Sequence, residues 1–84
     1  MIYTGELLNG KPNGQGTMSW PSGETYIGTF LDGKYHGHGT LKLPDESKYI
    51  GCFFNGVPHG QGQLTSFKDG TIREGTWFKG EYNG

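Results

Sequence analysis

Alanine, the residue with the highest helix propensity, is absent from this chain of 84 residues. Glycine, which destabilises helix interiors, occurs 17 times, and four prolines add further positions that interrupt a helix. Aromatic residues make up 14% of the chain, more than a disordered segment usually carries, and the formal net charge is only −1. The composition therefore excludes a helix bundle and predicts a small, folded, all-β domain.

The sequence is also poor in cysteine, in long apolar runs and in charge of one sign. The single Cys52 cannot form an internal disulfide, which favours a reducing compartment. No run approaches the roughly 20 apolar residues of a membrane-spanning helix, and residues 1–10 lack the layout of a signal peptide. Seven basic and eight acidic residues supply no basic face for nucleic acid. We expect a soluble, cytoplasmic protein, at most peripheral to a membrane or to the cytoskeleton.

The glycines repeat with a period of 23 or 24 residues. They form four columns: Gly5, Gly28, Gly51 and Gly75; Gly10, Gly33, Gly56 and Gly80; Gly14, Gly37, Gly60 and Gly84; and Gly16, Gly39 and Gly62. Columns of mainly aromatic residues accompany them: Tyr3, Tyr26 and Tyr49; Leu7, Phe30, Phe53 and Trp77; and Trp20, Leu43 and Phe67. Four glycine columns at one period indicate tandem copies of a single structural unit.

Each unit has the pattern of a β-hairpin. In the second copy, residues 26–31 and residues 37–43 alternate between an apolar and a polar face. The segment between them, residues 32–36, contains a glycine suited to a tight turn. Stacked hairpins predict an all-β fold: a single-layer, elongated, twisted antiparallel sheet of about seven strands, an open solenoid.

The third copy is one residue longer than the first two. Ser66 stands where the alternation would place an aromatic residue, and Phe67 follows it. We interpret the extra residue as a β-bulge that returns Phe67 to the aromatic face.

Glycine and aromatic residues share one face of the predicted sheet for a steric reason. A glycine in a strand lets a neighbouring ring lie directly on bare backbone, where the ring buries a large area. An isolated hairpin buries too little to fold alone, so we expect stability to depend on contacts between neighbouring copies.

Residues 26–39, followed by a second strand and Pro44, resemble the MORN repeat (membrane occupation and recognition nexus), and residues 3–16 and 49–62 match it as closely. The resemblance implies one array over residues 1–84, with repeats at 3–25, 26–48 and 49–72 and a truncated repeat at 73–84. It also implies an interaction or scaffolding module that binds protein partners, dimerises or binds phospholipid. Glu46, Arg73 and Leu7 depart from the pattern, in place of a glycine, a tyrosine and an aromatic residue.

Two segments imitate a nucleotide-binding loop, because residues 5–11 and 28–34 both read GxxxxGK. That chemistry needs a Ser or Thr next for Mg²⁺ and a helix that begins there. Pro12 and Tyr35 follow instead, inside a predicted hairpin. We interpret these glycines as turn positions and expect no nucleotide cofactor.

The remaining reactive side chains predict neither an enzyme nor a metal site. His36 and His59 share a column with Asn13 and Asn83, which indicates a hydrogen-bonding position at the edge of a turn. His36 and His38, with Cys52, form only a weak candidate metal set. The repeat register places no histidine beside Cys52 to activate it, and we expect no carboxylate on the aromatic face, so a glycosidase-like pair is absent.

The aromatic face is the candidate binding site. Its rings either pack only against each other or take part in holding a partner, because a one-layer sheet has no second layer to cover that face. On the second interpretation a peptide, a helix or a second copy binds in an aromatic groove, and open strand edges add further contacts. The chain ends within a repeat, which leaves such an edge. The predicted partner-binding residues are Tyr3, Trp20, Tyr26, Phe30, Tyr49, Phe53, Phe67 and Trp77.

Three other functions compete with a protein-interaction module. Acidic phospholipid, in particular phosphoinositide, is the main alternative, although the seven basic residues are spread along the chain instead of forming a patch. A carbohydrate or choline reader would also use tandem glycine–aromatic hairpins, but the residue order fits that type poorly. An enzyme is the weakest alternative, since no catalytic set is present.

Overall fold

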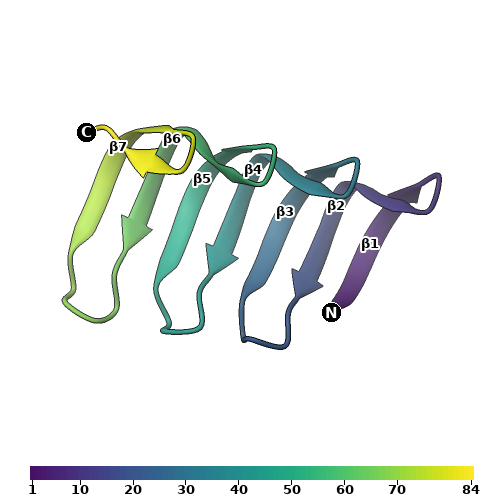
Figure 1. Ribbon diagram of the computed structural model, residues 1–84, viewed down its shortest axis with the longest axis horizontal. Coiled ribbons are helices and arrows are strands. Elements are labelled where there is room, and N and C mark those ends of the chain that lie inside the picture. The colour runs from purple at the N-terminus through teal and green to yellow at the C-terminus, as the bar shows by residue number, and fades with distance from the viewer.

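The computed structural model describes all residues, Met1–Gly84, and consists of one eight-stranded antiparallel sheet (Figure 1). Each strand pairs with the next in the chain, so the spatial order equals the sequence order. The strands are β1 (Ile2–Leu8), β2 (Lys11–Ser19), β3 (Thr25–Leu31), β4 (Lys34–Lys42), β5 (Lys48–Phe54), β6 (Val57–Thr65), β7 (Ile72–Phe78) and β8 (Glu81–Tyr82). The predicted open, single-layer sheet of hairpins is confirmed. The strand count exceeds the expected one because the last two-residue strand pairs with β7.

The sheet is long and thin, with principal extents of 39 × 24 × 15 Å. The two-residue turns within hairpins lie along one long edge, which we call the turn edge, and the longer connections between hairpins lie along the opposite edge, the loop edge (Figure 1). The structure has no helix that is long and apolar enough to cross a membrane.

The turn edge is built from four equivalent turns. Their first residues have φ between 51° and 53°, and a glycine with positive φ follows each of them, as two-residue hairpin turns require. The glycine N–H of one turn donates to the previous hairpin: Gly33 N lies 2.9 Å from Pro12 O, and the same bond recurs from Gly56 and Gly80. The turns are therefore hydrogen-bonded to one another along the stack. The four turns are Asn9-Gly10, Asp32-Gly33, Asn55-Gly56 and Lys79-Gly80.

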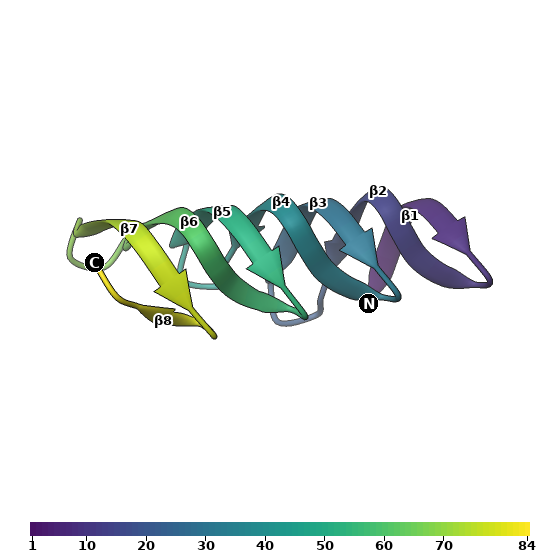
Figure 2. The ribbon, with the colours of Figure 1, turned by 90° about the horizontal axis from the view of Figure 1, so that it is seen from above.

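The first three hairpins each bend where one strand has two residues more than its partner. Gly28 pairs with Gly39 and Phe30 pairs with Tyr35, so β4 uses four residue steps where β3 uses two. Gly37 lies inside this irregularity with a φ of +82°, a conformation that favours glycine. The same shift occurs in the hairpins β1–β2 and β5–β6, and the strands curve in the view from above (Figure 2). The third glycine column therefore marks a bend.

The prediction of a β-bulge at Ser66 is wrong. β6 ends at Thr65, and Ser66 begins the connection to β7, which is one residue longer than the other two connections. Ser66 N donates to Thr71 O at 2.8 Å and its carbonyl accepts from Gly70 N, so the extra residue is absorbed by a hydrogen-bonded turn. Phe67 consequently lies in the loop edge and is 65% exposed.

The steric interpretation of the glycine–aromatic face is confirmed. A Cβ added to Gly39 would overlap the ring of Tyr26, and the same holds at Gly62 for the ring of Tyr49. The Tyr26 hydroxyl donates to Thr29 O at 2.9 Å, which fixes the ring over the glycine. A tyrosine of one strand therefore covers a glycine of the next, and this contact builds the core on what we call the inner face of the sheet.

Candidate functional site

Five of the eight predicted binding residues form the core of the molecule. Tyr26 is fully buried, and the others are at most 6% exposed. Their rings contact one another edge to face, with centroid separations of 5.0–5.2 Å. Tyr3 extends this series at one end, 5.1 Å from the next ring. We call the series Tyr3, Phe30, Tyr26, Phe53, Tyr49 and Trp77 the ring row.

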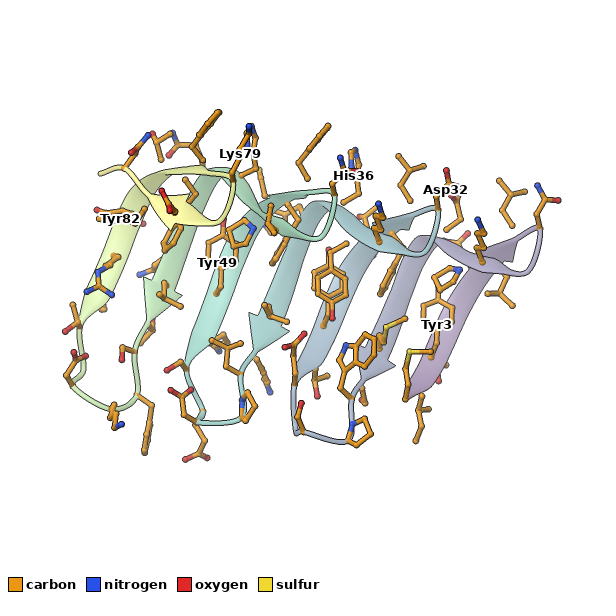
Figure 3. The ribbon with its side chains drawn as sticks, in the orientation of Figure 1. Tyr3, Asp32, His36, Tyr49, Lys79 and Tyr82 are labelled. Atoms are coloured by element: carbon orange, nitrogen blue, oxygen red, sulfur yellow. The ribbon has the colours of Figure 1, made fainter.

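The three remaining predicted residues are accessible, and only two of them, Tyr3 and Trp20, lie close together. Tyr3 is half-buried at the first strand, Trp20 is 39% exposed in the first loop-edge connection, and Phe67 lies in the third connection. Figure 3 shows Tyr3 and Tyr49 on their strands, well separated along the sheet. Of the predicted binding residues, Tyr3 and Trp20 are therefore the accessible ones at the β1 end of the sheet.

A groove of about 560 Å³ lies on the inner face at this end of the sheet. It runs from the loop edge, where Trp20 and Glu24 stand, to the turn edge, where Gly33 and Lys34 stand. Half of its lining residues are hydrophobic. The lining residues are Met1, Tyr3, Leu7, Gly10, Pro12, Met18, Trp20, Glu24, Gly33, Lys34, Tyr35 and Gly56.

At the loop-edge end of the groove, three side chains form a hydrogen-bonded chain. The Trp20 indole Nε1–H donates to the Tyr35 hydroxyl at 2.8 Å, and that hydroxyl donates to Glu24 Oε2 at 3.0 Å. The ring of Tyr35 also stacks on the ring of Tyr26, with 4.0 Å between the ring centroids and 7° between the ring planes. Burial, and secondarily the bond to the Glu24 carboxylate, raises the pKa of Tyr35 to about 12, so its proton stays in place at neutral pH.

The expectation that the aromatic face holds no carboxylate is therefore wrong, because Glu24 lines the groove. Sequence reasoning also missed Tyr35 and Met18 as groove residues. A signal was present in the repeat columns: Tyr35 stands where Pro12 and Pro58 stand in the neighbouring copies, and it breaks the pattern. The residues that the copies share determine the fold, and a residue that differs between copies, such as Tyr35, is not part of that pattern.

The turn edge carries a second row of side chains on the opposite, outer face. The rings of His36, Phe54, His59 and Phe78 follow one another at centroid separations of 5.2–5.7 Å. Lys79 N donates to His59 Nδ1 at 3.3 Å, and Asp32 N donates to Asn13 Oδ1 at 3.4 Å. These bonds confirm, at His59 and Asn13, the hydrogen-bonding role predicted for the repeat column that contains Asn13, His36, His59 and Asn83. The equivalent atom His36 Nδ1 has no partner, and Figure 3 places His36 at this edge with Asp32 and Lys79.

The outer face has a shallow polar hollow of about 520 Å³ over β4 to β7. Cys52 and His38 both line it, and they stand directly opposite each other on β5 and β4. The statement that the register places no histidine beside Cys52 is therefore wrong. No group of three His, Cys, Asp or Glu side chains in the structure is arranged to hold a metal ion.

Comparison with known protein families gives one result. The family model described as MORN repeat matches three consecutive segments, residues 3–25, 26–48 and 49–71. Each matched segment begins at a tyrosine of the repeat column, one residue after the first residue of β1, β3 or β5, so each covers one hairpin and the connection that follows it. No curated protein gives a significant match to the chain.

Proposed function

The chain belongs to the MORN repeat family, and we propose that it is a non-catalytic module that holds a peptide segment of a protein partner in the groove on its inner face. The observation that carries this proposal is the accessible groove itself. In the middle of the inner face the rings are covered by their neighbours, whereas here Tyr3 and Trp20 remain accessible and line a groove. Accessible aromatic side chains in a preformed concavity are typical anchors for a partner.

The shape of the groove favours an extended or helical segment over a compact ligand. Its strand residues come from β1, β2 and β4, and it reaches both edges of the sheet through the loop-edge connection and the hairpin turns. Its lining mixes apolar rings, methionine side chains and the charged groups of Glu24 and Lys34. The groove therefore has contact surfaces for apolar, basic and acidic side chains of a peptide.

The test is a selection of random peptides displayed on phage against the immobilised chain. We expect the selected peptides to bind the wild type and to lose at least about tenfold in affinity against Trp20→Ala and Tyr3→Ala, because anchor truncations often cost more than about 1.4 kcal/mol. Ile27→Ala is the matched control, since Ile27 is an exposed apolar residue on the outer face. Selected peptides that bind both groove variants as tightly as the wild type would refute the proposal.

Phe30 and Phe53 are not useful test positions, although both belong to the predicted site. They are 1% and 3% exposed, so their truncation removes core contacts and unfolds the chain before it reports on binding. Variants at Trp20 and Tyr3 separate binding from folding more cleanly, because both side chains are partly exposed.

Self-association is an alternative use of the same module. The outer edge of β1 has unpaired backbone groups, and Ile2, Leu7 and Leu8 are exposed on that strand. An edge of this kind pairs with a strand of another chain. Light scattering over increasing concentration measures it directly, and a strict monomer at all concentrations excludes it.

Acidic phospholipid is the second alternative, and the turn edge is where it would bind. Lys11 and Lys34 hold equivalent positions there, but Val57 and Glu81 follow them in the same column. Co-sedimentation with phosphoinositide-containing vesicles at low salt tests it, and binding that weakens as salt rises identifies an electrostatic contact.

A further inference from the structure

We propose that the loop-edge end of the groove, formed by Trp20, Glu24 and Tyr35, receives the basic side chain of the partner peptide, arginine in preference to a neutral residue. This inference rests on the proposed function and names the chemistry of the partner that fits it. It depends on three observations: the departure from the repeat, the fixed carboxylate and the charge at the opposite edge.

The repeated fold does not require this group of side chains. The same backbone hydrogen bond closes each loop-edge connection, from Trp20 N to Glu24 O, from Leu43 N to Ser47 O and from Ser66 N to Thr71 O. By this bond the equivalents of Glu24 are Ser47 and Thr71, and those of Trp20 are Leu43 and Ser66, so neither side chain is needed for the backbone of the connection. Tyr35 likewise replaces the proline of its neighbours. Three departures from the repeat thus meet in one hydrogen-bonded chain, so they are explained by a local role and not by the general needs of the hairpin stack.

The Glu24 carboxylate is held ready for a cation. The Tyr35 hydroxyl donates to Oε2, and the structure gives the carboxylate no other side-chain hydrogen bond. Oε1 therefore keeps its capacity to accept from a guanidinium or ammonium group in a charge-assisted bond. Because Tyr35 is itself fixed by Trp20 and by stacking on Tyr26, the carboxylate needs little reorganisation when a ligand arrives.

The indole of Trp20, beside the carboxylate, also favours an arginine side chain. Trp20 is 39% exposed while its indole N–H is bonded to Tyr35, so part of the indole lies open to the groove. An arginine side chain stacks well on such a surface, because its planar guanidinium is attracted to the ring and is weakly hydrated.

The charge at the other end of the groove fixes the direction of the peptide. Lys34 lines the groove at the turn edge, whereas Glu24 lines it at the loop edge. A basic side chain is repelled by the first position and attracted by the second. Apolar neighbours of that side chain then lie over Tyr3 and Met18 in the middle of the groove.

The experiment compares two blocked pentapeptides, acetyl-Gly-Leu-Arg-Leu-Gly-amide and the same peptide with citrulline in place of arginine. Citrulline has nearly the shape of arginine without its charge. Binding is followed by NMR through the indole N–H signal of Trp20. The indole N–H of Trp77, which donates to Gly62 O at 3.1 Å in the core, is the internal reference.

For the wild type we expect the arginine peptide to bind about 5- to 10-fold more tightly than the citrulline peptide, as charge-assisted contacts are worth more than neutral ones. In Glu24→Gln, whose amide oxygen still accepts from Tyr35, we expect the two affinities to become equal. Glu74→Gln is the matched control, because Glu74 is exposed on β7 and lies on the outer face, away from the groove, and we expect this variant to retain the preference for arginine. The preference of the wild type should also shrink as salt is added.

The outcomes separate this inference from the proposed function. If both peptides shift the Trp20 signal with equal affinity, the groove binds peptides but the inference is overturned. If Glu24→Gln keeps the preference, Glu24 is not the acceptor and the assignment is overturned. If neither peptide shifts the Trp20 signal at millimolar concentration, the groove is not a peptide site, and the proposed function fails with the inference.

Discussion

Glu46 holds a loop-edge turn position with a φ of +71°, where Gly23 and Gly70 stand in the other two connections. A side chain in this conformation is strained by its Cβ, and Glu46 makes no side-chain hydrogen bond that offsets the strain. We therefore expect Glu46→Gly to raise the free energy of unfolding by about 0.5–1 kcal/mol, measured by urea denaturation. Its neighbour provides the contrast: Asp45 Oδ1 accepts from Ser47 N at 2.9 Å, so Asp45→Gly should destabilise the chain. An Asp45→Gly variant as stable as Glu46→Gly would contradict this account.

The glycines beneath tyrosine rings are needed for space alone. Gly62 does not have a positive φ, yet a Cβ there would overlap the ring of Tyr49. We expect Gly62→Ala to lower the free energy of unfolding by about 3 kcal/mol, the upper range for overpacking. Gly10→Ala is the control, because a Cβ at Gly10 meets nothing within 4 Å and carries only the cost of its φ of +79°. Equal losses for the two variants, measured by thermal unfolding, would show that the ring contact is not the cause.

The strands β3, β4 and β5 each contribute one tyrosine whose ionisation is suppressed. Burial raises the pKa of Tyr26, Tyr35 and Tyr49 to about 12, from an ordinary value of 10.0. Between these two values the unfolded chain loses protons that the folded chain keeps, so stability is full below pH 10 and falls as the pH rises toward 12. We expect tyrosinate absorbance and loss of near-ultraviolet circular dichroism to change together in this window. Ionisation of all three tyrosines near pH 10 in a chain that stays folded would contradict the burial of these three rings.

At the level of elements, the sequence predicts the hairpins well because period, alternation and turn glycines all depend on local backbone chemistry. The position of Ser66 was not predictable in this way. An extra residue is accommodated either as a bulge in the strand pairing or in the connecting turn. The turn costs less free energy here because Asp69 Oδ1 and Ser66 O accept backbone N–H groups within it. The same reasoning explains the bends, which need an unequal residue count across two strands that only the pairing register reveals.

The candidate site was only partly predictable for a related reason. Alternation places Tyr26 and Phe53 on the correct face, but it does not show that the ring of one repeat covers that of the next, which depends on how closely the repeats stack. Five predicted binding residues are therefore core residues in the structure, and whether any of them also contacts a partner stays a prediction. Glu24 reaches the groove because the first connection turns it toward Tyr35, a long-range contact that no local pattern encodes.

At the level of the whole molecule, stability varies along the stack. Each interior hairpin packs against a neighbour on both sides, whereas β8 has two residues and pairs only with β7. We expect amide hydrogen exchange to be slowest in β4 and β5, where Phe53 contacts the rings of Tyr26 and Tyr49, and fastest in β8. Uniform protection from β1 to β8 would show that the array opens only as one unit.

The direction of the backbone hydrogen bonds has a mechanical consequence. In an antiparallel sheet these bonds run perpendicular to the strands, and here they run along the long axis of the molecule, 39 Å in extent, with the first and last strands at its opposite ends (Figure 1). A pull on the termini therefore stretches one strand pair at a time, instead of shearing many bonds together. We therefore expect the hairpins to peel off one after another at low force in single-molecule pulling, and not to resist tension as one unit.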